Sequence, residues 1–397
     1  MDHPVDFLIA GGGIFGLTAA VTLAKRGHEV GLVDAGNIPN HLAASTDVTK
    51  AVRMEYGADE GYFAMAEASI AGWHAWNEQF DEALYHEVGF LMLCSTSIED
   101  PRHHYEASSL NMLLSNGYTP LHLRQDELRD RFPAVDASNY PEAIFNAKAG
   151  YVRASRVVEH LLAEARALGV TVVEHAPVAE IEKEGGRVRG IRFRDGRQWA
   201  CGHLVVAVGA CTSLLVPELQ GAILSTGHPV FWLKPEAPTL FKAPKLAVFA
   251  ADISNTGWYG FPYLEKEGIV KVARHADGLV VHPEQDDRQV TDEEVATMRD
   301  FLSRTFPQLS DAPLVFTRRC LYADTFDGHF WVDQHPEIEG LTVSTGGSGH
   351  GLKMAPVLGD LTADIVLGLP RPDAARFRWR RFSGDVAAKE DARYMAT

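Results

Sequence analysis

The sequence has little of what marks secreted, membrane-spanning or nucleic-acid-binding proteins. Cysteine is scarce, with four in 397 residues at uneven spacings, which excludes a disulfide scaffold and a cysteine-based zinc cluster. No apolar run approaches the length that spans a bilayer. Basic residues are outnumbered by acidic ones, and a formal net charge of −16 repels nucleic acid and anionic membranes, so neither is an expected partner.

The N-terminus also lacks a basic segment, and its first apolar run ends in glycines, which indicates a strand and not a signal peptide. These absences predict a cytoplasmic protein. The length of 397 residues exceeds one ordinary hydrophobic core, so two interleaved domains are expected. Residues 87–144 are expected to mix short strands with proline and aspartate breaks, and residues 225–316 to form a second strand-rich region.

A glycine-rich turn follows the first predicted strand. Gly11, Gly13 and Gly16 form a G-x-G-x-x-G pattern that opens an alanine- and leucine-rich helix, and Asp34 ends the next strand, about 20 residues further on. Glycines let a pyrophosphate approach the backbone at the helix N-terminus, and the carboxylate can bind a ribose hydroxyl. The pattern predicts a dinucleotide site without separating NAD from FAD. Its position at the extreme N-terminus, with another buried strand at residues 204–209, favours FAD.

Four further blocks follow along the chain: Asp47–Arg53, Trp258–Pro262, Arg319–Tyr322 and Gly349–Lys353. Together with the N-terminal glycines they resemble, in the same order and over nearly the whole chain, the FAD amine oxidases related to monomeric sarcosine oxidase, N-methyltryptophan oxidase, pipecolate oxidase and the fructosyl amino acid oxidases.

The resemblance implies an α/β protein in which a Rossmann-like FAD-binding domain is interleaved with an α+β substrate domain on a mixed, largely antiparallel sheet. The implied division assigns residues 1–86, 145–222 and 317–397 to the FAD-binding domain. Residues 87–144 and 223–316 are assigned to the substrate domain.

Cys320 matches the cysteine to which this family attaches its flavin, by addition of the sulfur to the 8α-methyl group of the isoalloxazine ring. The resemblance therefore implies covalently bound FAD. A thiolate is a strong nucleophile, and Arg318 and Arg319 stand beside it in the sequence, where they could favour the thiolate. A buried core cysteine is the alternative, and the other three cysteines are expected to be structural.

Lys271 and His275 have a spacing that resembles the sarcosine oxidases, in which the lysine lies next to the flavin and serves oxygen activation. A positioned ammonium stabilises the negative charge that develops as O2 is reduced. Residues four apart in a strand share a face, so both side chains are expected to face one cavity. The alternative is a solvated lysine at a strand edge, but the surrounding stretch, residues 270–273, is otherwise apolar.

Arg53 and Lys353, from opposite ends of the chain, match the family's pair that holds the substrate carboxylate. A bidentate arginine contact and a lysine charge would fix an amino acid with its amine-bearing carbon toward the flavin. Solvated surface charge is the alternative for Arg53, and contact with a phosphate is the alternative for Lys353.

Lys50 stands where the sarcosine oxidases carry an arginine over the flavin, and it is expected to act with Lys271 and His275 in catalysis. A lysine here looks more like the fructosyl amino acid and saccharopine-type oxidases, which indicates a nitrogen substituent larger than methyl. Tyr259 and Tyr322 are expected to wall the substrate cavity, although aromatic residues at such spacings are also typical of a core.

The expected cofactor-binding residues are Gly11, Gly13, Ile14, Phe15, Gly16, Asp34, Ala35, Thr49, Lys50, Val178, Gly209, Cys320, Gly347, Gly349, His350, Gly351 and Lys353. His350 has an alternative role, because in a Gly-His-Gly sequence it can simply fit the turn.

The expected reaction takes a hydride equivalent from the carbon next to the nitrogen of a small carboxylated amine to the flavin, and O2 then reoxidises the flavin to give hydrogen peroxide. No metal is expected, and the protein is expected to be a monomer or a small homo-oligomer. Two other functions remain open. One is a flavin dehydrogenase that passes electrons to an acceptor other than oxygen, and the other is a non-catalytic dinucleotide-binding module.

Overall fold

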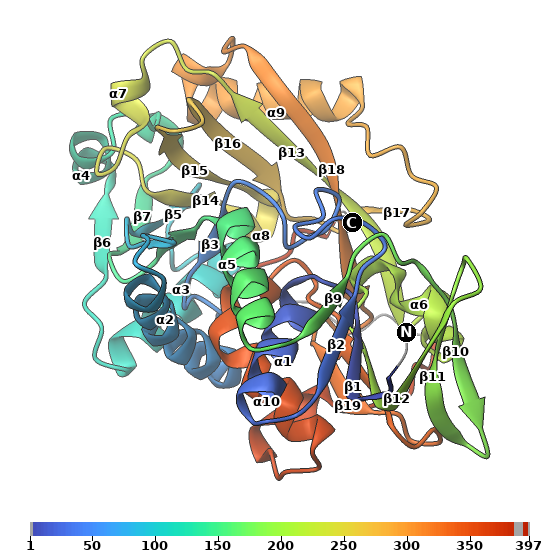
Figure 1. Ribbon diagram of the computed structural model, residues 1–397. Coiled ribbons are helices and arrows are strands. Elements are labelled where there is room, and N and C mark those ends of the chain that lie inside the picture. The colour runs from blue at the N-terminus through green and yellow to red at the C-terminus, as the bar shows by residue number, and fades with distance from the viewer. Residues whose placement is uncertain (1–2, 385–391, 396–397) are drawn as a thin grey trace.

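Two large β-sheets organise the chain in the computed structural model, which describes residues 3–384 and 392–395 (Figure 1). One has eight strands and the other nine, and a small third sheet consists of β3 (Lys50–Val52), β8 (Gly150–Val152) and β4 (Tyr85–His86). The predicted α/β class, with a parallel nucleotide-binding sheet and a mixed second sheet, is confirmed.

The eight-stranded sheet is built around the N-terminal strand. Its central strands are parallel and buried on both faces, which explains their continuous apolar sequences. Their spatial order is β10–β11–β12–β1–β2–β9, with β20 beside β12 and β19 beside β20. The strands are β1 (Val5–Ala10), β2 (Val30–Val33), β9 (Thr171–Val173), β10 (Val178–Glu184), β11 (Arg187–Phe193), β12 (Gln198–Val206), β19 (Trp331–Gln334) and β20 (Leu341–Thr345).

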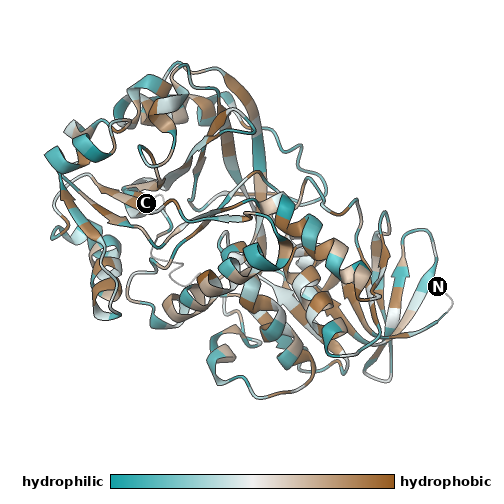
Figure 2. Ribbon diagram, turned by 60° about the vertical axis from the view of Figure 1, so that its left-hand side comes forward, coloured by the Kyte–Doolittle hydropathy of each residue, from teal (hydrophilic) through white to brown (hydrophobic). Residues whose placement is uncertain are grey.

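Four helices contribute to the core on one side of this sheet: α1 (Ile14–Lys25), α2 (Glu60–Phe80), α5 (Ala154–Ala167) and α10 (Ala355–Val366). In α5 the apolar residues recur at helical spacing, and this buried face packs against α1. The start of α2 is fixed by Asp59, whose carboxylate accepts the backbone N–H of Tyr62 at 2.9 Å. Figure 2 shows hydrophobic colour concentrated on the strands and hydrophilic colour on many outward helix positions.

The nine-stranded sheet lies above the first in Figure 1. Its strands run in the order β17–β13–β16–β15–β14–β5–β7–β6, with β18 on β13, and all neighbours are antiparallel except β14 and β5. The strands are β5 (Phe90–Cys94), β6 (Leu121–Arg124), β7 (Glu142–Asn146), β13 (Ile223–Leu233), β14 (Val248–Ala251), β15 (Trp258–Leu264), β16 (Ile269–Arg274), β17 (Leu279–Val280) and β18 (Leu314–Thr325).

Helices occur in both regions, residues 87–144 and 225–316, for which mainly strands were predicted. For the segments that form these helices, the prediction is wrong. The longer ones are α3 (His104–Ser115), α4 (Gln125–Arg131) and α9 (Asp292–Thr305). A capping box starts α9, with the Thr291 hydroxyl accepting the Glu294 N–H and the Glu294 carboxylate accepting the Thr291 N–H. The short ones are α7 (Pro238–Phe241) and α8 (Ile253–Thr256), and a further short helix, α6 (Thr212–Leu215), lies outside both regions.

Two of the expected domain boundaries do not coincide with the ends of strands. The boundaries expected after residues 144 and 316 fall inside β7 and β18, both of which belong to the nine-stranded sheet. We therefore propose to move them to the ends of these strands, after Asn146 and Thr325. Among the described helices, none is long and apolar enough to cross a membrane.

Candidate functional site

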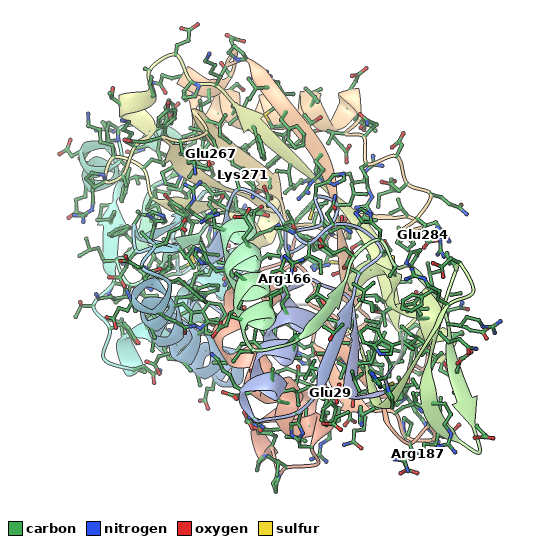
Figure 3. The ribbon with its side chains drawn as sticks, in the orientation of Figure 1. Glu29, Arg166, Arg187, Glu267, Lys271 and Glu284 are labelled. Carbon is green, nitrogen blue, oxygen red and sulfur yellow. The ribbon has the colours of Figure 1, made fainter. Side chains whose placement is uncertain are left out.

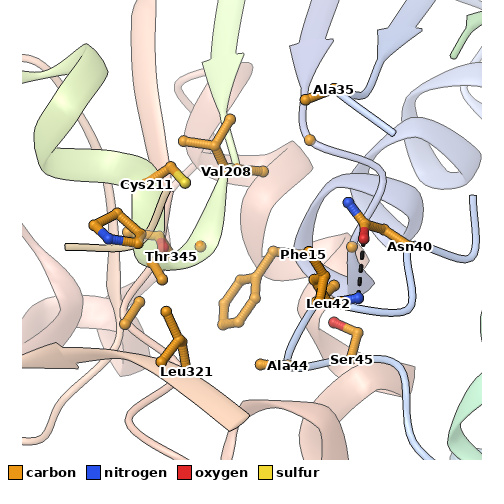
Figure 4. Close-up of a pocket in the computed structure, with 18 of the residues that line it drawn as sticks. Phe15, Ala35, Asn40, Leu42, Ala44, Ser45, Val208, Cys211, Leu321 and Thr345 are labelled. Carbon is orange, nitrogen blue, oxygen red and sulfur yellow. Dashed lines mark hydrogen bonds between the residues drawn. The ribbon is translucent and has the colours of Figure 1, made fainter. Parts of the chain in front are cut away.

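A cavity of about 410 Å³ opens at the carboxyl ends of β1 and β2. Ligands of open parallel sheets bind at this edge. One wall comes from the glycine turn after β1, and the opposite wall comes from Leu321 and Tyr322 of β18 in the nine-stranded sheet. Figure 4 shows the ring of Phe15 between Leu321 and the segment that contains Ala44 and Ser45. The cavity therefore lies between the two sheets, where a cofactor can contact residues of both.

The glycine turn leaves room for a ligand because it has no side chains of its own. Gly11 has a φ of 111°, and a Cβ there would lie 2.3 Å from the carbonyl oxygen of Ala207. At Gly16 a Cβ would lie 1.9 Å from the carbonyl oxygen of Gly11, so α1 packs closely on the turn. Helix α1 then begins at Ile14, whose N–H donates to the Ser45 hydroxyl at 2.9 Å, and the positive end of the helix dipole at this N-terminus suits a pyrophosphate.

Asp34 ends β2 at the rim of the same cavity. One carboxylate oxygen accepts the N–H of Gly12 at 2.8 Å, and the other accepts the N–H of Gly36 at 2.9 Å. These contacts hold the carboxylate in one orientation beside the turn. The volume, the bare glycine backbone and the fixed carboxylate all fit the dinucleotide part of FAD.

Gly11→Ala is expected to give a protein that no longer retains FAD, because the added methyl group collides with backbone at a φ that alanine avoids. The measurement is flavin absorbance per polypeptide after gel filtration. The matched control is Gly27→Ala, which has a comparable φ of 88° but nothing within 4 Å of the added Cβ. Full flavin content in Gly11→Ala would contradict the assignment of this turn.

A second, smaller cavity of about 60 Å³ adjoins the first and shares Lys50, Gly349 and Leu352 with it. Arg53 and Lys353 both line it, although they are 300 positions apart in the chain. The guanidinium carbon of Arg53 lies 5.0 Å from the ring centre of Tyr56, and Nζ of Lys353 lies 4.9 Å from the same ring centre. The structure thus brings the two predicted cations together, while their role in binding a carboxylate stays a prediction.

Lys271 is buried in β16, which rules out the solvated strand-edge alternative (Figure 3). Its ammonium donates to the Asp47 carboxylate and to the Thr49 carbonyl oxygen, each at 2.6 Å. Burial lowers the pKa of Lys271 to about 8, even though the charge of Asp47 favours the ammonium form and acts in the opposite direction.

The expectation that Lys271 and His275 face one cavity is not met at these two cavities. His275 lines the smaller cavity, whereas Lys271, in the part of the chain that the structure describes, lines neither. Strand β16 ends at Arg274, one residue before His275. Asp47 contacts both Lys271 and Lys50, and so connects Lys271 to a residue that lines both cavities.

Asp47, which was not predicted as a site residue, lies among three cationic side chains. Its Oδ2 lies 2.6 Å from Nζ of Lys271, 3.5 Å from Nζ of Lys50 and 3.9 Å from Nη2 of Arg318. Burial alone would raise the pKa of Asp47, but these three cations hold it well below its usual range. Its presence inside the Asp47–Arg53 block was the signal that could have identified it.

Cys320 lies buried in β18, with Nζ of Lys50 4.0 Å from its sulfur. Arg318 and Arg319 have other partners, because Arg318 donates to the carbonyl oxygens of His41 and Thr46 and Arg319 pairs with Asp286. The ammonium of Lys50 thus lies beside the sulfur. Burial alone would lower the pKa of Lys50, but the charges of the Cys320 sulfur and of Asp47 raise it.

The aromatic and histidine residues of the site have fixed positions. Tyr322 stacks on His228 with ring centres 4.0 Å apart, and burial raises the pKa of Tyr322 well above its usual range. Tyr259 lines the smaller cavity. His350 also lines it, with Nδ1 3.1 Å from the Tyr56 hydroxyl and Nε2 3.1 Å from the Gly328 carbonyl oxygen. These two bonds fix the ring.

Most residues predicted to bind the cofactor line the larger cavity. They are Gly11, Gly13, Ile14, Phe15, Asp34, Ala35, Lys50, Val178, Gly209, Gly347, Gly349 and Gly351. The others lie beside it: Gly16 inside α1, Thr49 and Cys320 in adjoining segments, and His350 and Lys353 at the smaller cavity. Lining residues that were not predicted include Asn40, Ser45, Arg194, Cys211, Glu284 and Arg288, which lie outside the quoted motifs.

Comparison with known proteins gives a family match over most of the chain. A family described as "FAD dependent oxidoreductase" (DAO) matches residues 6–365. A monomeric sarcosine oxidase from Streptomyces avermitilis is 29% identical over 381 residues, covering 92% of this chain and 94% of the relative. An L-saccharopine oxidase from Schizosaccharomyces pombe is 28% identical over 419 residues, covering 94% of this chain and 92% of the relative.

Solved structures show the same fold. The fructosyl amine:oxygen oxidoreductase Amadoriase I from Aspergillus fumigatus superposes with a TM-score of 0.83 at 23% identity, covering 100% of this chain and 94% of the other.

Proposed function

This chain belongs to the FAD dependent oxidoreductase family, and from that membership we propose that it is an oxidase of a carboxylated, N-substituted amine. It is a flavoprotein that acts on CH–NH donors. The meeting of Arg53 and Lys353 at a cavity that adjoins the dinucleotide site carries the proposal for the substrate. A monomeric or small oligomeric state and a cytoplasmic location stay predictions.

The chain's own residues would bind and orient the substrate. Arg53 and Lys353 would hold the carboxylate, which places the amine nitrogen and its carbon toward the larger cavity. Tyr259 and His350 would exclude water from the sides of the smaller cavity. When bound, FAD supplies the two-electron chemistry, removing a hydride equivalent from the amine carbon and passing the electrons to oxygen.

A screen under anaerobic conditions tests the proposal. N-methyl, N-fructosyl and saccharopine-type amino acids are added to the holoenzyme, and bleaching of the yellow flavin identifies a substrate. Relatives acting on sarcosine and on L-saccharopine support including small and large nitrogen substituents. Oxygen uptake with one peroxide per amine would then separate an oxidase from a dehydrogenase. No bleaching by any carboxylated amine would refute the proposal.

Cys320→Ser is expected to abolish covalent attachment of FAD while non-covalent binding persists. The resemblance and the 4.0 Å approach of the Lys50 ammonium to the sulfur support this. Wild-type protein precipitated with acid should stay yellow, whereas precipitated Cys320→Ser should release all its flavin. Cys211→Ser is the control, because Cys211 also lines the larger cavity. Release of flavin from the wild type would overturn the covalent link.

A further inference from the structure

The C-terminal residues Ala392–Tyr394, here called the C-terminal strap, contact three segments that contribute lining residues to the smaller cavity. We propose that Arg393 is a positioning residue for the substrate-binding site and that the strap is a structural part of that site. The inference rests on the proposed function, because it takes the smaller cavity to be where the carboxylated amine binds.

Arg393 holds the turn that forms one wall. Its side chain is buried and makes two bonds to the Asp324 carboxylate, Nη1 to Oδ2 at 2.6 Å and Nη2 to Oδ1 at 2.8 Å. Nη2 also donates to the carbonyl oxygen of Ser348 at 2.6 Å. Ser348 has a φ of 42°, a conformation that non-glycine residues avoid. The guanidinium thus ties a strained residue to a buried strand.

The tied turn leads directly to the substrate site. Gly349, the next residue, lines both cavities, and a Cβ there would lie 2.5 Å from the Tyr322 ring and 3.1 Å from the His275 ring. The chain then continues through His350 to Lys353 in one short 3-10 helix (Gly351–Met354). A displacement of the Ser348 carbonyl would therefore move the backbone that carries Lys353.

Tyr394 and Ala392 contact the other walls. The N–H of Tyr394 donates to the carbonyl oxygen of His275 at 3.2 Å, and the Arg274 guanidinium lies 5.1 Å from the Tyr394 ring centre. Ala392 is fully buried in the apolar cluster that contains Phe90 and Ile253, which also line the smaller cavity. Three consecutive strap residues therefore support three separate walls.

This arrangement distinguishes Arg393 from an ordinary core ion pair. Asp324 already accepts a hydrogen bond from Thr226 and lies 3.8 Å from Nε2 of His228, so other groups remain beside its charge without Arg393. The N–H and hydroxyl of Ser348 also bond to Ala323 and Thr325 of β18, whereas its carbonyl oxygen accepts the guanidinium N–H of Arg393. Loss of Arg393 should therefore loosen the turn more than it destabilises the strand.

The test measures the Kd for acetate, a minimal carboxylate, by titrating it into the oxidised holoenzyme. The change in flavin absorbance reports the binding. We expect Arg393→Gln to raise the Kd for acetate about tenfold or more, since one well-placed hydrogen bond contributes roughly that factor. Arg393→Lys should recover part of the affinity. Met395→Ala is the control, because this neighbouring side chain is exposed, and it should bind acetate as the wild type does.

The double variant Asp324→Asn/Arg393→Gln separates positioning from folding, because it leaves no buried charge unpaired. We expect it to melt near the wild-type temperature and still bind acetate weakly. If Arg393→Gln binds acetate with the affinity of the wild type, the inference about Arg393 is overturned, while the proposed carboxylate site is not affected. No acetate binding by the wild type would overturn the proposed carboxylate site, and the inference with it.

Discussion

Reduced Lys271→Met enzyme is expected to react with oxygen about a hundred to a thousand times more slowly than the wild type, the usual effect of removing one preorganised charge-stabilising group. The ammonium of Lys271 is buried, and Asp47 lies between it and the ammonium of Lys50, which lines both cavities. Reduction of the flavin by the amine should remain within a few-fold of normal. Stopped-flow mixing of reduced enzyme with O2 measures the first effect, and anaerobic mixing with the amine measures the second.

The control must account for Asp47, which loses its nearest cation in Lys271→Met. A buried carboxylate left with a weaker pairing destabilises the fold. Asp47→Asn/Lys271→Met removes both charges, so it should recover stability without recovering the oxygen reaction. Lys266→Met, at an exposed lysine between β15 and β16, should change neither property. A normal oxygen rate in Lys271→Met would remove this residue from the oxidative step.

The same lysine predicts the pH dependence of the oxygen reaction. Its pKa is lowered to about 8, so the ammonium form predominates below that pH and is lost as the pH rises through it. The rate constant for reoxidation should therefore fall above about pH 8, or somewhat higher if the bound reduced flavin carries a negative charge. A rate that stays flat to pH 10 in the wild type would contradict the role of the charge.

Arg53→Met is expected to lower kcat/KM for the carboxylated amine by a factor of about thirty to a thousand. Truncating one partner of a buried charged contact costs roughly 2–4 kcal/mol, which corresponds to that range. Arg53 is buried and lines the smaller cavity with Lys353. Steady-state kinetics with the best amine from the screen gives the number, and the melting temperature reports any loss of folding.

An amine that lacks the carboxylate provides the matched control. The wild type should strongly prefer the carboxylated substrate, and Arg53→Met should lose most of that preference because its remaining contacts do not depend on the carboxylate. Arg53→Met and Lys353→Met should also be non-additive in the double variant, since both cations would bind one group. Retention of the full preference in Arg53→Met would place the carboxylate elsewhere.

The local features of the dinucleotide site were predictable from the sequence because they depend on neighbouring residues. The strand, the glycine turn, the helix from Ile14 and the carboxylate of Asp34 all follow from patterns within one short segment. The meeting of Arg53 with Lys353 was expected only through the order of the blocks, since no spacing rule connects residues so far apart.

Features that depend on side-chain direction were not predictable. Asp47 contacts Lys271 across 224 positions, and Arg318 turns away from Cys320 toward backbone carbonyls of another segment. Arg393 follows no motif, and its importance arises from the depth at which the C-terminal strap is buried. In each case the contact depends on how distant segments pack together. A pattern within one segment contains no information on that packing.

The interleaving of the two sheets also bears on how the protein is made. β1 lies between β2 and β12, and the walls of the larger cavity extend from Ala10 to Leu352. A ribosome that has delivered the first hundred residues has therefore produced only part of the cavity wall. The cavity is complete only after the segment that contains Leu352 has emerged, so its two walls cannot enclose the whole cofactor before that point.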